Sequence, residues 1–246
     1  IGEFDEHSGK TLEMLHREFY GDNIPLLRTN PATAEMIKYA SNAFLAAKIS
    51  FINELANICE RLPQKVDIVE VARAIGMDPR IGPEFLNAGV GWGGSCLPKD
   101  TTALATFSRK IGYRPKILED VIRVNLKQAR HVIDVIKEEI GDLKGKKIAI
   151  LGLSFKPNTE DVRGAASIRI INHLIQEGAQ VHAYDPVAID NAKKVLGTKI
   201  KYSPTIAKCL SKADGCILAT EWEEFKKLSP EDFARLMRKP FLFDGR

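Results

Sequence analysis

The pattern of apolar and polar positions changes period near residue 141 and divides the chain into two kinds of predicted structure. Before this point apolar residues recur at helical spacing, and no segment is a convincing strand. Beyond it, short apolar runs alternate with amphipathic segments, separated by Gly or Asp turns, as in right-handed βαβ units. The pattern therefore predicts an α/β chain, in which an all-helical unit precedes a doubly wound domain built on a parallel sheet.

A long helix dominates the predicted first unit. Asn30 is a good N-cap and Pro31 suits the first helical position, so we expect the helix to begin there. No Gly or Pro follows until Pro63, so the predicted helix covers residues 31–62 and measures about 46 Å. Its apolar positions surround much of its circumference, which indicates burial on more than one side.

Shorter elements complete both units. A loop rich in Gly and Pro is expected at residues 77–98, because these residues punctuate regular structure. Further helices are predicted at residues 8–19, 67–74, 99–111 and 117–140 of the first unit. In the second unit we predict strands at 147–153, 180–184, 215–219 and 241–243, and helices at 167–177, 188–196 and 230–237.

The domain boundaries follow from these elements. Residues 141–145 read as a linker, so we place a helical central domain at 30–142 and the doubly wound domain at 143–246. Ile1 is not an initiator methionine. We therefore expect the sequence to be a fragment, with residues 1–29 a remnant of a preceding domain.

Composition and charge exclude several classes of protein. The 36 Lys and Arg residues against 32 Asp and Glu leave a net charge of +4, too small to favour nucleic acid or a membrane surface as partner. The chain has neither a long apolar run nor a signal-peptide pattern, and we expect it in the cytoplasm. Its four cysteines form no CxxC pair, so we predict free thiols and no metal site.

Cys96 is the candidate nucleophile. It follows four glycines of residues 89–94, which let a backbone approach a ligand closely. The loop runs into a predicted helix whose N-terminal amides would favour a thiolate, and Lys99 adds positive charge. Asp100 could act as a base or orient water. The other cysteines are explained by packing within predicted helices and a strand: Cys59, Cys209 and Cys216.

Two further groups of residues could contribute to a site. Lys38 and Asn42 lie four residues apart on one face of the long helix; they could stabilise an oxyanion or simply solubilise the helix. The polar Asn53 and Glu54 on the same helix are more simply structural. The run from Gly152 to Lys156, with Arg163 beyond it, follows the first predicted strand, where open parallel sheets bind ligands, although a solvated loop explains it equally well.

Together these motifs resemble the UDP-glucose/GDP-mannose dehydrogenase family. The matching segments are Ile37-Lys38-Tyr39-Ala40-Ser41-Asn42, Gly93-Gly94-Ser95-Cys96-Leu97-Pro98-Lys99-Asp100, Gly152-Leu153-Ser154-Phe155-Lys156-Pro157 and Phe243-Asp244-Gly245-Arg246. They occur in the family's order along nearly the whole chain, and the enzymes that act on UDP-glucose match best. The resemblance implies a helical dimerisation domain and a Rossmann-like domain that binds the sugar nucleotide. The family's NAD-binding domain would precede them.

The resemblance also implies roles for individual residues. The family oxidises the C6 alcohol of a nucleotide sugar to a carboxylate with NAD, through a cysteine thiohemiacetal and thioester. Cys96 would be the nucleophile, Lys38 and Asn42 would stabilise the oxyanion, and Asp100 would activate water. Arg163, with Cys96, matches the position that contacts NAD, and Arg80 would reach the site of a partner subunit in a homodimer formed through helix 31–62. The remaining substrate-binding residues would be Phe85, Leu86, Asn87, Gly89, Trp92, Gly93, Phe155, Lys156 and Arg246.

Two alternatives remain open at this point. A GDP-mannose dehydrogenase would share nearly all these residues, and only Phe85-Leu86-Asn87 favours UDP-glucose. A nucleotide-binding dimerisation module without catalysis is also compatible with the sequence, because no GxGxxG fingerprint follows a predicted strand and opens a helix. For the same reason we expect the fragment alone to be inactive.

Overall fold

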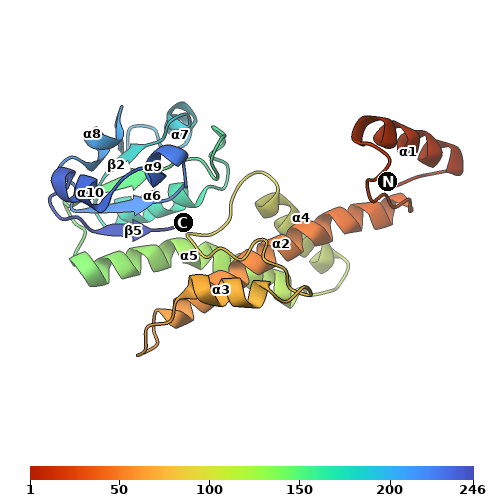
Figure 1. Ribbon diagram of the computed structural model, residues 1–246, viewed down its shortest axis with the longest axis horizontal. Coiled ribbons are helices and arrows are strands. Elements are labelled where there is room, and N and C mark those ends of the chain that lie inside the picture. The colour runs from red at the N-terminus through yellow and green to blue at the C-terminus, as the bar shows by residue number, and fades with distance from the viewer.

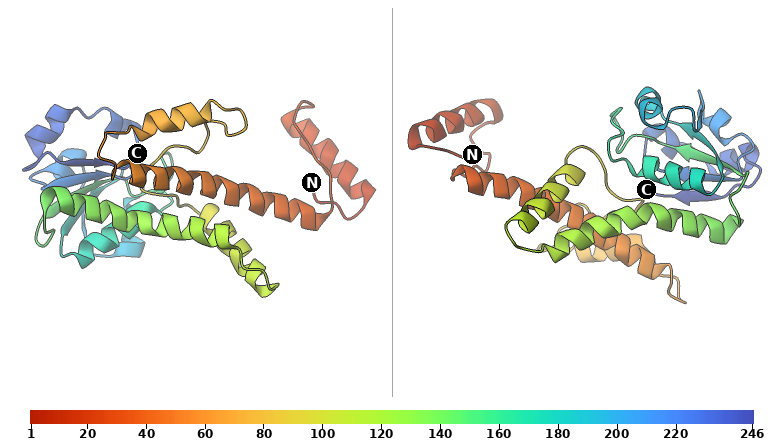
Figure 2. Two further views of the ribbon diagram at one scale, coloured as in Figure 1. Left: turned by 90° about the horizontal axis from the view of Figure 1, so that it is seen from below. Right: turned by 180° about the vertical axis from the view of Figure 1, so that it is seen from behind.

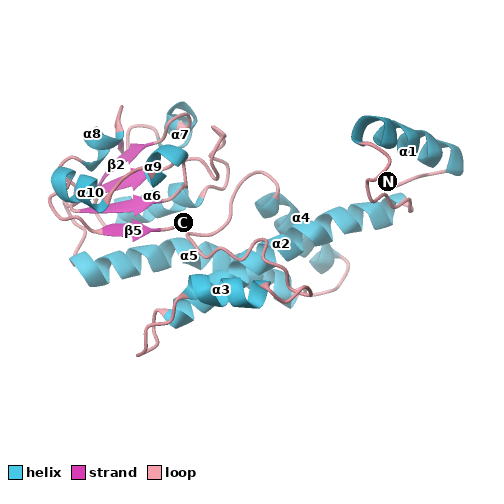
Figure 3. Ribbon diagram, viewed as in Figure 1, coloured by secondary structure: helices cyan, strands magenta, loops and turns pink.

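The computed structural model describes all residues 1–246 and places the two predicted units side by side. The helical unit contains α2 (Pro31–Cys59), α3 (Ile68–Gly76), α4 (Leu97–Lys110) and α5 (Lys116–Ile140). The second unit contains every strand of the sheet (Figure 3). The predicted α/β class, with helices first and a parallel sheet second, is confirmed.

The long helix α2 begins where its sequence predicts. Asn30 caps it by accepting a hydrogen bond from the Thr33 amide at 2.9 Å. The helix ends at Cys59 rather than at residue 62, because Pro63 disfavours helical geometry in the residue before it. Helices α4 and α5 both pack along α2.

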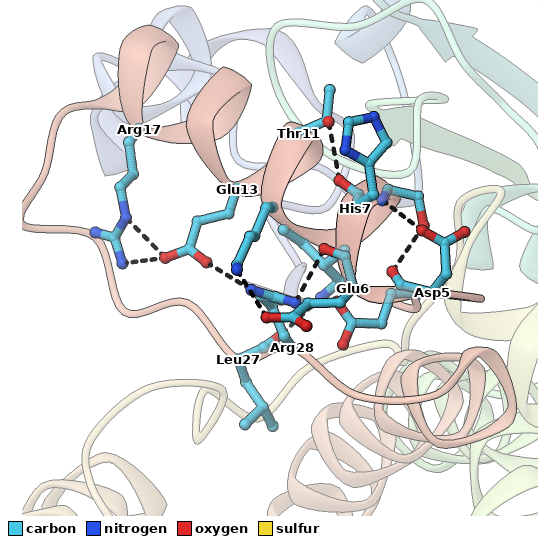
Figure 4. Close-up of polar contacts among 12 residues, drawn as sticks. Asp5, Glu6, His7, Thr11, Glu13, Arg17, Leu27 and Arg28 are labelled. Atoms are coloured by element: carbon cyan, nitrogen blue, oxygen red, sulfur yellow. Dashed lines mark hydrogen bonds and ion pairs between the residues drawn. The ribbon is translucent and has the colours of Figure 1, made fainter.

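The segment 1–30 stands apart from the rest of the chain at the N-terminal end of α2 (Figures 1 and 2). Helix α1 (Glu6–Tyr20) buries only Gly9 and leaves Met14, Leu15 and Phe19 exposed. Arg28 pairs with Glu3 at 2.7 Å and with Glu13 at 3.6 Å, which folds the segment back on itself (Figure 4). The segment is held by its own ion pairs rather than by a hydrophobic core.

The second unit is a five-stranded, all-parallel sheet in the order β3-β2-β1-β4-β5. The reversal of strand order beside β1 is the doubly wound arrangement that the resemblance implies. The strands are β1 (Lys147–Leu151), β2 (Gln180–Tyr184), β3 (Lys201–Tyr202), β4 (Gly215–Leu218) and β5 (Leu242–Asp244). The helices are α6 (Ala166–Gln176), α7 (Ile189–Leu196), α8 (Ile206–Leu210), α9 (Glu223–Lys226) and α10 (Pro230–Leu236).

Two hydrophobic clusters cover the two faces of this sheet. The larger cluster joins residues of β1, β2 and β4 to α6, α7 and the second half of α5, including Val132, Ile133 and Ile136. The smaller one joins the opposite face to α8, α9 and α10. Helix α5 therefore belongs to both units, because its first half packs on α2 and its second half on the sheet. No helix of the chain has both the length and the apolar character that a membrane span needs.

Candidate functional site

A hydrogen-bonded chain of polar side chains joins α2 to the start of α4. Lys38 donates from Nζ to Asn42 Oδ1 at 3.2 Å, and Asn42 Nδ2 donates to Asp100 Oδ2 at 2.5 Å. Lys99 pairs with the other carboxylate oxygen of Asp100. Asn42 and Asp100 are 6% and 3% exposed. Three residues predicted from two separate motifs thus meet at one place, and the buried Asn42 amide joins the Lys38 ammonium to the Asp100 carboxylate.

Cys96 lies one helical turn before Asp100. It is the N-cap residue of α4, and its carbonyl accepts a hydrogen bond from the Asp100 amide at 2.9 Å. Cys96 is the exposed cysteine of the chain, whereas Cys209 and Cys216 are buried and Cys59 is half-buried. Burial raises the pKa of the Cys209 thiol to about 11. The accessible thiol is therefore the one that lies at a helix N-terminus beside charged groups.

Two ion pairs lie near Cys96, Lys99 with Asp100 and Arg163 with Asp161. The hydrogen bond from Lys99 lowers the pKa of Asp100 against the opposing effect of burial, and Asn42 and Lys38 lower it further. The Asp100 carboxyl is therefore ionised at neutral pH. The pKa of Arg163 is raised chiefly by Asp161, and the nearby Cys96 contributes to the same shift. Arg163 thus lies close enough to Cys96 for their charges to interact.

The glycine-rich loop reaches from the helical unit to the sheet. The Gly94 amide donates to the Arg163 carbonyl at 2.9 Å. A Cβ atom on Gly93 would lie 2.3 Å from the Gly164 carbonyl oxygen, and one on Gly94 would meet the Phe155 ring at 2.8 Å. Only glycine permits this approach. The loop therefore carries the Cys96 motif against the turn that contains Phe155 and Lys156.

Four of the predicted substrate-binding residues line one cavity of about 480 Å³, between the helical unit and the end of β5. They are Leu86, Asn87, Gly89 and Arg246. The Arg246 side chain donates from Nε to the Ala219 carbonyl at 2.8 Å and pairs with Glu221 at 3.1 Å. Burial lowers the pKa of Arg246. The cavity adjoins the glycine-rich loop, because the Val90 amide donates to the Gly245 carbonyl at 3.2 Å.

The other predicted residues lie in different environments. Arg80 is on the exposed surface, where its side chain is 88% exposed and pairs with Asp78 at 2.6 Å. Phe85 is 40% exposed and has a positive φ of 65°. Lys156 lies over the Phe155 ring, 5.6 Å from its centroid. Trp92 is buried, and its indole donates to Ser50 Oγ at 3.0 Å. Its side chain is therefore part of the core.

Asp185, at the end of β2, is a buried residue that the sequence patterns did not single out. Its Oδ2 accepts hydrogen bonds from the Leu153 amide at 2.7 Å, the Ser154 amide at 3.1 Å and the Trp222 indole at 3.2 Å. Asp185 thereby fixes the start of the turn that carries Phe155 and Lys156. The residue before a Pro at the end of a short apolar run was the available signal.

Comparisons with known proteins find matches to both units of the chain. Residues 32–127 match the central domain of the UDP-glucose/GDP-mannose dehydrogenase family, and residues 149–246 match its UDP binding domain. The UDP-glucose 6-dehydrogenase TuaD of Bacillus subtilis is 46% identical over 246 residues, which are 100% of this chain and 52% of the relative. The UDP-glucose 6-dehydrogenase AglM of Haloferax volcanii is 46% identical over 224 residues, 91% of this chain and 51% of the relative.

A solved structure extends the agreement to the backbone. The UDP-glucose dehydrogenase of Pyrobaculum islandicum superposes with a TM-score of 0.91 at 38% identity, over 100% of this chain and 54% of that chain. This chain spans about half the length of the relatives that it matches. Two adjacent domain matches, in the family's order and over most of the sequence, carry the assignment. The chain belongs to the UDP-glucose/GDP-mannose dehydrogenase family.

Proposed function

We propose that the whole protein oxidises the C6 alcohol of UDP-glucose to the carboxylate of UDP-glucuronate, with NAD as the hydride acceptor and Cys96 as the nucleophile. The observation that carries the proposal is the chain Lys38–Asn42–Asp100 beside an exposed cysteine. The two relatives described above are named UDP-glucose 6-dehydrogenases, which favours UDP-glucose over GDP-mannose as substrate.

The residues of the site divide the chemistry between them. One hydride would pass from the C6 alcohol to a first NAD molecule, and another from the thiohemiacetal to a second NAD molecule. Between these oxidations Cys96 Sγ adds to the C6 aldehyde, and the oxyanion of the thiohemiacetal is stabilised by Lys38 and the second amide hydrogen of Asn42. After oxidation to the thioester, water attacks the carbonyl carbon and gives a proton to Asp100. The C–S bond then breaks, which releases the carboxylate and restores the Cys96 thiolate.

Asp100 becomes a stronger base when one of its two contacts opens, although each of its oxygens keeps a lone pair that can accept a proton. Asn42 holds one oxygen from within the protein, and Lys99 holds the other with a side chain that is 67% exposed. Lys99 is therefore the partner that moves. Its release frees one oxygen for water and at the same time lets the pKa of Asp100 rise, because Lys99 is the largest cause of the lowered value.

The residues of this sheet do not fit NAD. Both Asp185 oxygens are occupied by amide and indole donors, so no carboxylate is free for a ribose at the end of β2. A Cβ atom on Gly152 would lie 2.5 Å from Thr220, so the turn after β1 is filled. We infer that NAD is held mainly by a part of the whole protein outside residues 1–246, and that Arg163 and Cys96 of this chain contact it. This chain alone should then form no NADH.

We further propose that the whole protein is a cytoplasmic homodimer formed through α2. Ile37, Phe44, Phe51 and Ile58 recur every seven residues and are all at least 45% exposed, so they form one apolar stripe along the helix. A second copy of the same stripe is the natural cover in a two-fold dimer. The exposed Arg80 would then be free to reach the nucleotide in the partner's site.

Two experiments test the proposed function. In the full-length enzyme, Cys96→Ser should abolish formation of the carboxylate, because the ester in place of the thioester forms and breaks slowly. Cys59→Ser, at the end of α2, is the matched control and should retain turnover. Near-normal activity of C96S would remove Cys96 from the mechanism. Calorimetry on the full-length enzyme should show tighter binding of UDP-glucose than of GDP-mannose, and the reverse order would favour the alternative substrate.

A further inference from the structure

The segment between Gly89 and Trp92 is an irregular loop. Side-chain amides make most of the hydrogen bonds to its backbone, and the Val90 amide donates to the Gly245 carbonyl. The Gly89 amide donates to Asn53 Oδ1 at 2.7 Å, and the Gly89 carbonyl accepts from Gln128 Nε2 at 3.0 Å. The Trp92 amide donates to Asn125 Oδ1 at 2.8 Å, and Asn125 Nδ2 donates to the Trp92 carbonyl at 3.0 Å. Three side-chain amides thus bond four backbone groups, and Arg169 also donates to the Trp92 carbonyl at 3.2 Å.

These three amides are among the most deeply buried polar residues of the chain. Asn53, Asn125 and Gln128 are 0%, 3% and 5% exposed. Asn53 comes from α2, whereas Asn125 and Gln128 lie one turn apart on α5. A buried amide costs free energy unless its hydrogen bonds are made. Their placement on one loop therefore couples the position of that loop to two helices.

Among the three amides, Asn125 makes the contact that lies nearest to Cys96 in sequence. It holds the backbone amide and carbonyl of Trp92, four residues before Cys96, and the intervening Gly93 and Gly94 add no side chains of their own. A Cβ atom on Gly91 would lie 2.5 Å from Asn125 Oδ1, so the loop passes directly over this amide. Glycines lose more conformational entropy on ordering than other residues, and a loop of this composition needs external contacts to hold one conformation.

We propose that Asn125 is a positioning residue for Cys96: its two hydrogen bonds to Trp92 fix the glycine-rich loop, and the loop fixes the thiol at the N-terminus of α4. The proposal rests on the proposed function in which Cys96 is the nucleophile. Asn125 touches neither substrate nor thiol. It acts through the Trp92 backbone, with Gln128 and Asn53 holding the earlier part of the loop.

A chemical probe of the thiol tests this positioning without any turnover. Iodoacetate is an anion and iodoacetamide is neutral, so the ratio of their alkylation rates at Cys96 reports how closely Lys99 and Arg163 surround the sulfur. We expect the wild-type chain to favour iodoacetate. Asn125→Ala should lower the ratio about threefold or more, since loosening the loop increases the average distance of the thiol from Lys99 and Arg163. Mass spectrometry of the Cys96 peptide measures both rates.

The control separates positioning from stability. Val132→Ala lies on the same helix and removes two methyl groups from the core of the sheet, so it should lower the melting temperature and leave the alkylation ratio unchanged. Asn125→Ser, which leaves room for a bridging water, should lie between Asn125→Ala and wild type, and it replaces Asn125→Ala if that variant does not fold. A wild-type ratio in a folded Asn125 variant would overturn the proposal, as would an equal fall in Val132→Ala.

Turnover in the full-length enzyme gives the second readout. Asn125→Ala should lower kcat about ten- to hundredfold, whereas Val132→Ala should keep the wild-type kcat at a temperature where it is fully folded. Unchanged kcat in Asn125→Ala would contradict the positioning role. The two proposals fail in different ways: active C96S contradicts the proposed function, whereas the alkylation ratio tests Asn125 even in a protein without activity.

Discussion

Asp100 combines deep burial with two hydrogen-bond partners of different mobility. Asn42 is anchored on α2, and Lys99 extends from the first turn of α4 into solvent. A carboxylate held in this way stays ionised to low pH, which keeps it ready to accept a proton but makes it a weak base. Removing the mobile partner should change both properties.

Lys99→Met in the full-length enzyme should move the acid limb of kcat to higher pH. The lowered pKa of Asp100 depends first on Lys99, so without it the carboxylate takes up a proton earlier as the pH falls, and activity is lost earlier. Turnover measured from pH 4 to 8 reports the shift. Lys110→Met, at the other end of α4, is the matched control. Superimposable acid limbs in the three proteins would rule out the coupling.

At the scale of the element, β2 carries a second titrating group. Burial, together with the positive charges of Lys147 and Lys201 on the neighbouring strands, lowers the pKa of His182 to about 4. The unfolded chain therefore binds this proton near pH 6.5, whereas the native sheet does not bind it until about pH 4. The free energy of unfolding must therefore decrease as the pH is lowered from 6.5 to about 4.

His182→Gln should flatten the pH dependence of stability between pH 6.5 and 4. We expect the variant to avoid a loss of roughly 1 to 2 kcal/mol, after allowance for solvent screening of a partly exposed ring. Urea unfolding at several pH values measures it, with His173→Gln, at a half-buried position on α6, as control. A wild-type slope in His182→Gln would show that other groups cause the acid sensitivity.

The sequence predicted long elements more accurately than short ones, for physical reasons. Caps and periodicity located α2 and α5 within a few residues, and β2 was predicted with its observed bounds. The short elements β3, α8 and α9 were missed, because two to five residues show no periodicity and depend on their neighbours. The sequence motifs assigned Cys96, Lys38 and Asn42 to one site. The hydrogen bond between Asn125 and Trp92 joins residues 33 positions apart, and no sequence pattern indicates it.

At the scale of the whole molecule, the exposed stripe on α2 is the feature that the described chain does not cover. Phe44→Glu with Phe51→Glu should give a monomer by sedimentation at micromolar concentration, since charges in an apolar interface remain unpaired. Val195→Glu, at a similarly exposed apolar residue on α7, should leave the dimer intact. A wild-type chain that sediments as a monomer would remove the stripe as an interface.

Subunit mixing tests whether the site spans two chains. In the full-length enzyme, Arg80→Ala and Cys96→Ala homodimers should each be weak or inactive, because a charge-assisted phosphate contact accounts for about a ten- to hundredfold effect on binding. The mixed dimer should regain one site with both residues intact. If exchange is confirmed and activity does not return, Arg80 acts within its own subunit or outside the site.

Helix α5 also affects how cooperatively the chain unfolds. Its 25 residues are shared between the core around α2 and the core of the sheet, so the two units have one continuous helix in common. Unfolding of either unit would remove the packing partners of one half of this helix. Calorimetry of this chain should therefore record one transition in which the calorimetric and van't Hoff enthalpies agree, and two separated peaks would mean that α5 breaks in the middle.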